Sequence, residues 1–198
     1  MTTIDDDAFV RLFQQRFGLT VDGWAGREVL AKLDELSPPT LPVLKDSEIP
    51  EDYFPMLAQI ESGNRPYIKA PTSSASGLYQ FIKSTWVSLG GKWGNNPNDA
   101  FGGLRPFETE QTKFAKIFTA KNAAYLRSRK IPVNKASLYA AHFFGPVTAA
   151  RVLGADVGDR ADLIAGPAAT QANKAILQGK TVQESLTWLF KKTGQWAR

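Results

Sequence analysis

The stretch YFPMLAQIESGNRPYIKAPTSSASGLYQF, residues 53–81, decides the fold of the larger part of this chain. Leu57, Ile60 and Glu61 follow the three-and-four spacing of one helix face, which predicts a short helix that Gly63 ends. A carboxyl group therefore lies where apolar side chains point. Burial and the negative end of the helix dipole both disfavour its charged form. We expect Glu61 to keep a proton near neutral pH and to serve as a general acid.

The second half of the stretch has a different character. Ser, Thr and Gly cluster over residues 69–81, and Leu78 alternates with Gln80, which predicts a small β-hairpin. The remaining sequence predicts helices, and the fold class is mainly α. The expected helix boundaries are Thr109 as a cap before Phe114, Ile117, Phe118 and Leu126, Asn134 and Gly145 around the next helix, Pro146 and Gly154 around a third, and a Thr181–Glu184 capping box with Gly194 as terminator.

The chain is predicted to have two domains. Residues 8–36 predict two short helices around a turn at Asp22-Gly23. A spacer rich in proline follows at 37–50 and has the composition of an extended linker. We therefore expect a small N-terminal domain at 1–36, a spacer at 37–50 and a larger helical domain at 51–198.

Composition excludes several kinds of chemistry. The 198 residues include no cysteine and one histidine, so disulfides, thiolate catalysis and a multi-histidine metal site are excluded. We expect neither a metal nor a cofactor. The net charge of +5 suits an anionic polymer such as nucleic acid, a cell wall or a lipid surface. No basic run with interleaved aromatic residues favours nucleic acid, so we expect no nucleic-acid partner.

Three ordered motifs resemble one enzyme family. Glu61-Ser62-Gly63 is followed by Gly77-Leu78-Tyr79-Gln80-Phe81 with Ser84-Thr85-Trp86, and then by Leu138-Tyr139-Ala140-Ala141-His142-Phe143-Phe144-Gly145-Pro146. Together they resemble the soluble lytic transglycosylase, goose-type lysozyme-like family, in the form found in phage endolysins. The resemblance covers about residues 52–150 and implies a lysozyme-like helical domain.

The resemblance also implies roles for particular residues. Glu61 would be the single catalytic acid and base, and the residues that would contact substrate are Ser62, Ser73, Gln80, Tyr139 and His142. Ser62 would support the Glu61 carboxyl group, and Tyr139 would face it. Many members read Ala-Tyr-Asn where this chain has His142. The helical spacing places Tyr139, His142 and Phe143 on one face, where they would line a sugar groove. The alternative is that Tyr139 and Phe143 belong to the core and His142 is a half-buried histidine with satisfied hydrogen bonds.

The N-terminal residues resemble a shortened peptidoglycan-binding type 1 module. Phe13-Gln14 precedes Gly18-Leu19-Thr20-Val21-Asp22-Gly23-Trp24-Ala25-Gly26, and Val29-Leu30-Ala31-Lys32-Leu33 follows. The wall-binding residues would be Asp22, Gly23 and Trp24. A generic helical hairpin with an Asp-Gly turn is the alternative.

These motifs predict a modular, antimicrobial type of phage endolysin. It would cleave the β-1,4 bond between N-acetylmuramic acid and N-acetylglucosamine and leave 1,6-anhydro ends. One alternative is a hydrolytic muramidase with Asp99, Glu108 or another acid as its second carboxyl group. A second is a non-catalytic wall-binding virion protein, and a third, resting on charge alone, is a nucleic-acid-binding protein.

The expected setting follows from the same resemblance. Asp5, Asp6 and Asp7 stand where an export signal would be basic and then apolar, so we expect synthesis in the host cytoplasm. The resemblance implies action on periplasmic peptidoglycan during host cell lysis. We also expect a monomer. A basic amphipathic end would contact an outer membrane or dock on the core, and we favour docking. Its residues are Leu186, Leu189, Phe190, Lys191, Lys192, Trp196 and Arg198.

Overall fold

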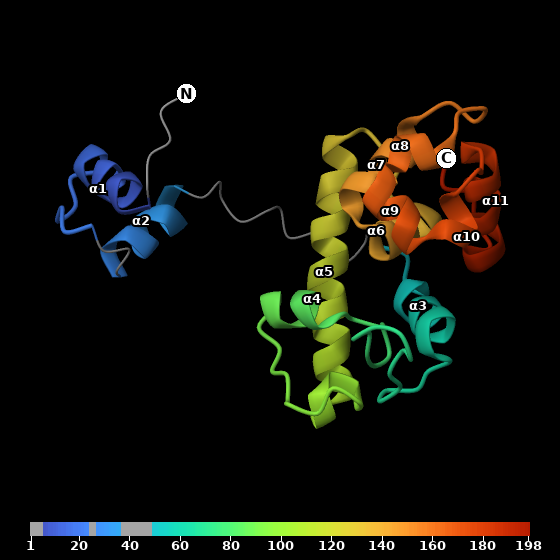
Figure 1. Ribbon diagram of the computed structural model, residues 1–198, viewed down its shortest axis with the longest axis horizontal. Coiled ribbons are helices and arrows are strands. Elements are labelled where there is room, and N and C mark those ends of the chain that lie inside the picture. The colour runs from blue at the N-terminus through green and yellow to red at the C-terminus, as the bar shows by residue number, and fades with distance from the viewer. Residues whose placement is uncertain (1–5, 24–26, 37–48) are drawn as a thin grey trace. The chain divides into compact units, whose positions relative to one another are not determined.

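The computed structural model describes residues 6–23, 27–36 and 49–198. The chain divides into two compact units, Met1–Val43 and Leu44–Arg198. Each unit is built mainly from α-helices, as the sequence predicts (Figure 1). The predicted spacer at 37–50 lies almost wholly outside the described residues.

The first unit contains α1 (Asp6–Arg16) and α2 (Arg27–Leu36). The buried side chain of Gln14 connects α1 to the Asp22-Gly23 turn. Its Nε2 donates to Oδ1 of Asp22 at 2.6 Å, and its Oε1 accepts from the backbone nitrogens of Asp22 at 3.1 Å and Gly23 at 2.9 Å. Three bonds from one amide therefore fix a turn that a helix of this length cannot fix alone.

The second unit holds the remaining helices. They are α3 (Tyr53–Ser62), α4 (Lys83–Ser88), the 3-10 helix η2 (Ala100–Gly103), α5 (Glu108–Ser128), α6 (Lys135–Phe144), α7 (Pro146–Gly154), α8 (Ala161–Ala165), α9 (Pro167–Ala172), α10 (Lys174–Leu177) and α11 (Val182–Thr193). Figure 1 shows α5 running through this unit, with α6 to α11 gathered beside one half of it. The helix α6 packs against α5, α7 and α11.

Several helix ends form where the sequence predicts them. Gly63 adopts a left-handed conformation that ends α3, and Gly194 does the same for α11. Asn134 caps α6, and Thr181 forms a reciprocal capping box with Glu184 at the start of α11. These predictions are confirmed because each depends only on residues within one helical turn.

The predicted cap of α5 is wrong. The helix begins at Glu108, so Thr109 lies inside its first turn, and Phe107 takes the cap position without a side-chain bond. A distant contact replaces the cap. The buried Gln111 donates from Nε2 to the carbonyl oxygens of Pro66 at 3.1 Å and Pro106 at 3.2 Å, which anchors the first turn.

The predicted hairpin at 69–81 is not confirmed, because this segment forms no strands and contains only isolated antiparallel bridges, Lys69 with Ser76 and Ser76 with Phe81. The alternation of Leu78 and Gln80 does not mark a strand. Leu78 and its neighbour Tyr79 are both buried, and Gln80 has a left-handed φ of 47°. Residues 77–80 therefore form a tight turn, closed by a bond from the Gln80 nitrogen to the Gly77 carbonyl oxygen at 3.3 Å.

The chain end is docked on the second unit. Leu186 and Leu189 of α11 are buried, and Nδ2 of Asn134 donates to the Ala197 carbonyl oxygen at 3.1 Å. The Arg198 guanidinium donates to the carbonyl oxygens of Leu153 and Ala155 at 2.7 and 2.6 Å. These contacts agree with the docked interpretation of the basic amphipathic end. Within the described ranges, no helix has the length and apolar character to cross a bilayer.

Candidate active site

Glu61 is the next-to-last residue of α3 and lies largely inside the protein. Its side chain is 14% exposed, and its Oε1 is buried without a hydrogen-bond partner. Burial raises the pKa of this carboxyl group to about 7, because removal from water penalises the carboxylate more than the neutral acid. The burial of this carboxyl group and the direction of its pKa shift agree with the expectation that Glu61 can hold a proton near neutral pH.

Tyr139 lies on α6 beside Glu61 and is only 2% exposed, so it does not line an open groove as the sequence predicted. A hydrogen-bonding interaction with Tyr139 lowers the Glu61 pKa and partly opposes the effect of burial. The pKa of Tyr139 is raised well above its ordinary value, first by burial and then by the neighbouring Glu61 carboxylate. The phenol therefore stays protonated and can donate to the carboxylate that forms when Glu61 loses its proton.

His142 lies one turn after Tyr139 on α6, and its side chain is 9% exposed and lies among aromatic rings. Its ring centroid is 6.1 Å from that of Phe81 and 5.8 Å from that of Phe118. Its Nε2 lies 3.0 Å from the Tyr79 carbonyl oxygen, which requires a proton on Nε2. Burial lowers the His142 pKa to about 4, so the ring is neutral near pH 7. Its Nδ1 is buried and has no hydrogen-bond partner.

Tyr53 belongs to the same cluster, although the sequence did not point to it. Its ring is fully buried in the first turn of α3. Burial raises the Tyr53 pKa strongly, and the charges of Glu61 and Tyr139 raise it further. The hydroxyl makes no hydrogen bond of good geometry, although Thr119 is close enough to oppose the shift. Tyr53, Leu57 and Glu61 are spaced four residues apart on α3, so the helical periodicity that placed Glu61 could also have identified this phenol.

The helix α11 adds a second aromatic layer behind Tyr139. The Trp188 ring stacks on the Tyr139 ring at 5.7 Å between centroids with an interplanar angle of 27°, and lies 5.0 Å from the Phe143 ring. The Lys192 ammonium lies 6.0 Å from the centre of the same indole. Its charge lowers the Glu61 pKa, so α11 takes part in the electrostatics of the site.

The other substrate-contact residues have mixed placements. The Ser62 hydroxyl donates to the Ala58 carbonyl oxygen at 2.9 Å and accepts from the Arg65 nitrogen at 3.2 Å, so it holds the helix end and not the Glu61 carboxyl group. Gln80 donates from Nε2 to the Gly77 carbonyl oxygen at 2.9 Å, which holds the tight turn. Ser73 is exposed, and its Oγ accepts from the Ala75 nitrogen at 3.1 Å.

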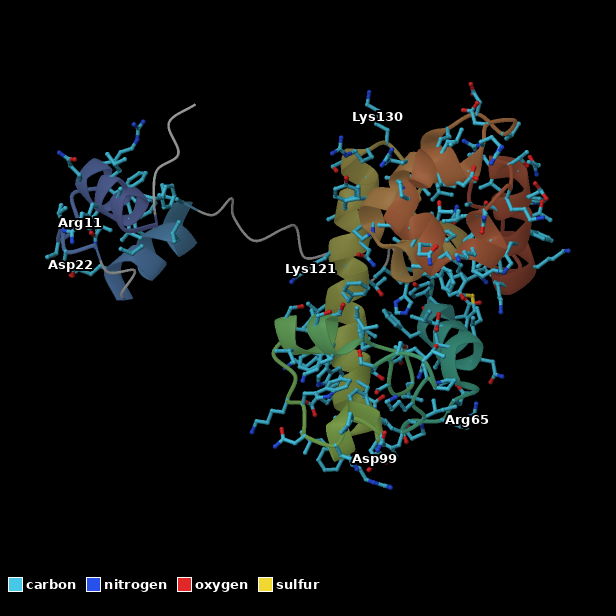
Figure 2. The ribbon with its side chains drawn as sticks, viewed as in Figure 1. Arg11, Asp22, Arg65, Asp99, Lys121 and Lys130 are labelled. Atoms are coloured by element: carbon cyan, nitrogen blue, oxygen red, sulfur yellow. The ribbon has the colours of Figure 1, made fainter. Side chains whose placement is uncertain are left out.

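The two acids considered as partners for Glu61 lie at the surface. Asp99 is exposed and accepts from Nδ2 of Asn96 at 2.7 Å, and Figure 2 shows it projecting from the second unit. Glu108 is exposed at the start of α5. Neither is among the groups that shift the Glu61 pKa. In the described part of the chain, no three His, Cys, Asp or Glu side chains come together as a metal site requires.

The candidate wall-binding residues lie in the first unit. Gln14 holds Asp22 and Gly23 in the turn described above, and Gly23 adopts a left-handed φ of 77°. Trp24 lies outside the described residues. A search of the chain against protein-family models finds no match.

Proposed function

We propose that this protein cleaves the glycan strands of peptidoglycan as a lytic transglycosylase, with Glu61 as its only catalytic acid and base. One observation carries the proposal: a buried carboxyl group with a pKa of about 7 faces a protonated phenol and lies beside a neutral imidazole. A group with this pKa is half protonated at neutral pH, which is the condition under which one residue can donate a proton and later accept one.

The reaction would proceed in two proton transfers. Glu61 donates its proton to the glycosidic oxygen as the bond from C1 of N-acetylmuramic acid breaks, and the N-acetyl group of the substrate stabilises C1. The resulting carboxylate then takes the proton of the 6-hydroxyl as its oxygen bonds to C1, which forms the 1,6-anhydro ring. Between these steps Tyr139 and Lys192 stabilise the carboxylate, because both favour the charged form of Glu61.

The placement of the other acids favours this route over hydrolysis. Hydrolysis of a glycosidic bond ordinarily uses two carboxyl groups that flank it at roughly 5 to 9.5 Å from each other. Asp99 and Glu108 are exposed and do not act on Glu61. Transglycosylation needs one carboxyl group because the substrate supplies the nucleophile.

The first unit supports a role at the cell wall. Its motif resembles a wall-binding module, and we propose that it holds the enzyme on peptidoglycan while the second unit acts. The proposal extends to a phage endolysin that acts on periplasmic peptidoglycan, because the motif around Tyr139 and His142 resembles the form in that class.

Mass spectrometry of the muropeptides released from purified peptidoglycan tests the proposal. The wild-type chain is expected to release fragments that lack one water at the muramic acid end, and Glu61→Gln is expected to release none. Asp99→Asn and Glu108→Gln are the matched controls and should release the same anhydro products as wild type. If the products carry reducing ends in place of anhydro ends, the protein is a hydrolytic muramidase. If the wild-type chain releases no fragments, the non-catalytic wall-binding alternative is favoured.

A further inference from the structure

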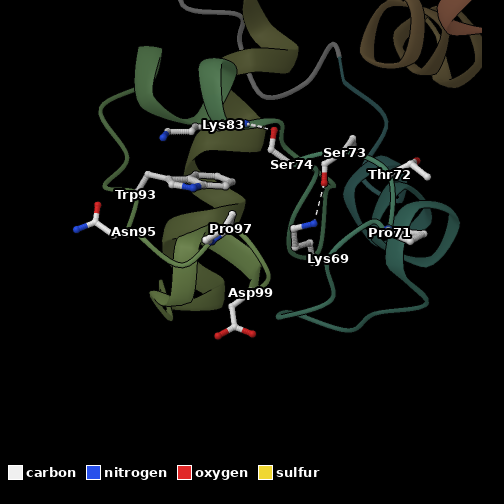
Figure 3. Close-up of a pocket in the computed structure, with 11 residues that line it drawn as sticks. Lys69, Pro71, Thr72, Ser73, Ser74, Lys83, Trp93, Asn95, Pro97 and Asp99 are labelled. Carbon is white, nitrogen blue, oxygen red and sulfur yellow. Dashed lines mark hydrogen bonds between the residues drawn. The ribbon is translucent and has the colours of Figure 1, made fainter.

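A hollow separate from the Glu61 cluster lies on the second unit, and Glu61 does not line it. Its volume is about 470 Å³, and it lies between the loop 69–74, the start of α4 and the loop 93–99. Figure 3 shows the Trp93 indole, Pro97 and Lys83 toward one side and Lys69 with Ser73 toward the other. We call it the Trp93 hollow.

Its walls are fixed by hydrogen bonds and ring packing. Ser74 Oγ accepts from the Lys83 backbone nitrogen at 3.0 Å, which joins the first loop to α4. The Trp93 ring packs edge-on against the fully buried Phe101 at 5.7 Å between centroids, and the Gly94 nitrogen donates to the Phe101 carbonyl oxygen at 2.9 Å. The indole is therefore held in place before any ligand arrives, which reduces the entropy cost of binding.

Of the charged side chains that line the hollow, some already have hydrogen-bond partners within the protein and one does not. Lys69 Nζ donates to the carbonyl oxygens of Ala70 at 3.1 Å and Ser73 at 3.0 Å, so it is tied to its own loop. The Asp99 carboxylate is bonded to Asn96 and points away from Lys83 (Figure 3). Within the described part of the chain, the exposed Lys83 ammonium makes neither an ion pair nor a hydrogen bond. Lys83 is thus the cation that remains for a ligand.

We propose that the Trp93 hollow binds a sugar unit that carries a carboxylate, with the ring on Trp93 and the carboxylate at Lys83. The indole and the rings of Pro71 and Pro97 provide apolar surfaces for the C–H faces of a sugar, and the surrounding serines provide partners for its hydroxyl groups. An unpaired ammonium at the rim selects a ligand with an anionic substituent.

The choice of ligand rests on the proposed function. The muramic acid units of peptidoglycan carry peptide stems that end in carboxylates, so one unit presents both a sugar ring and an anion. Binding at the Trp93 hollow would hold a peptide-bearing part of the strand apart from the bond that Glu61 cleaves. The hollow would therefore favour strands with peptide stems over uncharged chitin-like oligomers.

Nuclear magnetic resonance of the full chain tests this inference. The protein carries Glu61→Gln so that the ligand is not consumed, and Trp93→Phe assigns the Trp93 indole signal among the five tryptophans. The probes are a disaccharide tripeptide from peptidoglycan and an uncharged N-acetylglucosamine tetramer. The charged probe is expected to shift the Trp93 signal, and Lys83→Gln is expected to weaken its binding about fivefold, an effect that high salt removes.

Lys92→Gln is the matched control, because Lys92 is exposed beside Trp93 and does not line the hollow. It should bind the charged probe as the parent does. Equal affinity in Lys83→Gln, or an equal dependence on Lys83 for the uncharged tetramer, overturns the inference. Binding that depends on Lys83 in a protein whose wild-type form digests no wall would refute the proposed function alone. If wild type digests the wall but the charged probe shows no binding that depends on Lys83, only the proposed role of the Trp93 hollow is refuted.

Discussion

The Nε2 atom of His142 lies 4.0 Å from Oε1 of Glu61, within the distance of an ion pair, yet both groups are neutral at slightly acid pH. The imidazole already uses its Nε2 proton toward the Tyr79 carbonyl oxygen, and burial disfavours a second proton on the ring. Glu61 therefore has no cation in direct contact. The Glu61 pKa stays high because the effect of burial outweighs the lowering by Tyr139 and by the charge of Lys192.

The activity of the enzyme should fall as pH rises through the Glu61 pKa of about 7, because only the protonated acid can protonate the leaving oxygen. Lys192 lowers this pKa, so Lys192→Gln should move the loss of kcat/KM toward higher pH. Relative to its own rate at low pH, the variant should keep roughly twice as much activity at pH 8 as wild type does, the size of an exposed charge effect. Rates of wall digestion measured from pH 5 to pH 9 check this.

Lys191→Gln serves as the control for Lys192→Gln. Lys191 is the neighbouring exposed cation on α11 and is not among the groups that shift the Glu61 pKa. Its pH profile should match that of wild type. If both variants move the profile by the same amount, the effect comes from net charge and not from the position of Lys192.

Burial of Glu61 should lower the free energy of unfolding at pH values above the pKa that Glu61 has in the unfolded chain. The folded pKa of about 7 exceeds the ordinary 4.5, so the unfolded chain releases this proton first as pH rises. The free energy of unfolding should then decline between pH 4.5 and 7 and stay lower above pH 7 by about 3 kcal/mol. Glu61→Gln removes the titration, so the variant should be more stable than wild type at pH 8 and equally stable at pH 4. Urea unfolding at the two pH values tests this, and an equal difference at both would contradict it.

The candidate site was predictable from sequence where its residues lie on a single helix. Helical spacing placed Glu61 among apolar side chains and put Tyr139 and His142 on one face, and the structure has both arrangements. Contacts between different helices or loops left no comparable pattern in the sequence. The carbonyl oxygen that fixes the His142 ring comes from Tyr79, 63 positions away, and the indole that stacks on Tyr139 comes from α11.

The fold shows the same division between local and distant determinants. Asn134, Thr181 and Gly194 act within one turn, and their roles were predicted correctly. The start of α5 was misplaced because Gln111 fixes it by reaching the carbonyl oxygen of Pro66, 45 positions away. The tight turn was taken for a strand because Leu78 alternates with Gln80, whereas Leu78 and Tyr79 are both buried and the Leu78 nitrogen bonds to Gln111 of α5.

Acid should destabilise the protein through His142. Its folded pKa of about 4 is below the ordinary 6.5, so the unfolded chain takes up this proton first as pH falls. The stability that the neutral ring contributes is complete above pH 6.5 and is lost progressively toward pH 4. His142→Gln keeps a donor for the Tyr79 carbonyl oxygen and does not titrate. The difference in unfolding free energy between wild type and variant should therefore shrink as pH falls from 7 to 4, and a constant difference would contradict the assignment.

Gly77 is required both by its backbone and by its surroundings. Its φ is +80°, and a Cβ atom there would lie 2.3 Å from Oε1 of Gln111 and 2.4 Å from Cζ of Phe101. The same Gln111 oxygen accepts from the Leu78 nitrogen at 2.8 Å, so moving it breaks the bond that holds the turn to α5. Gly77→Ala should lower the free energy of unfolding by roughly 2 to 5 kcal/mol, the sum of left-handed strain and overpacking.

Gly179→Ala separates the two contributions. Gly179 has a similar φ of +70°, but no atom lies within 4 Å of its ideal Cβ position. Its substitution should therefore cost only the backbone strain, roughly 1 to 2 kcal/mol. Urea unfolding followed by tryptophan fluorescence compares the two variants. Equal losses would mean that Gln111 and Phe101 yield at little cost, and the proposed anchoring of the tight turn on α5 would then be wrong.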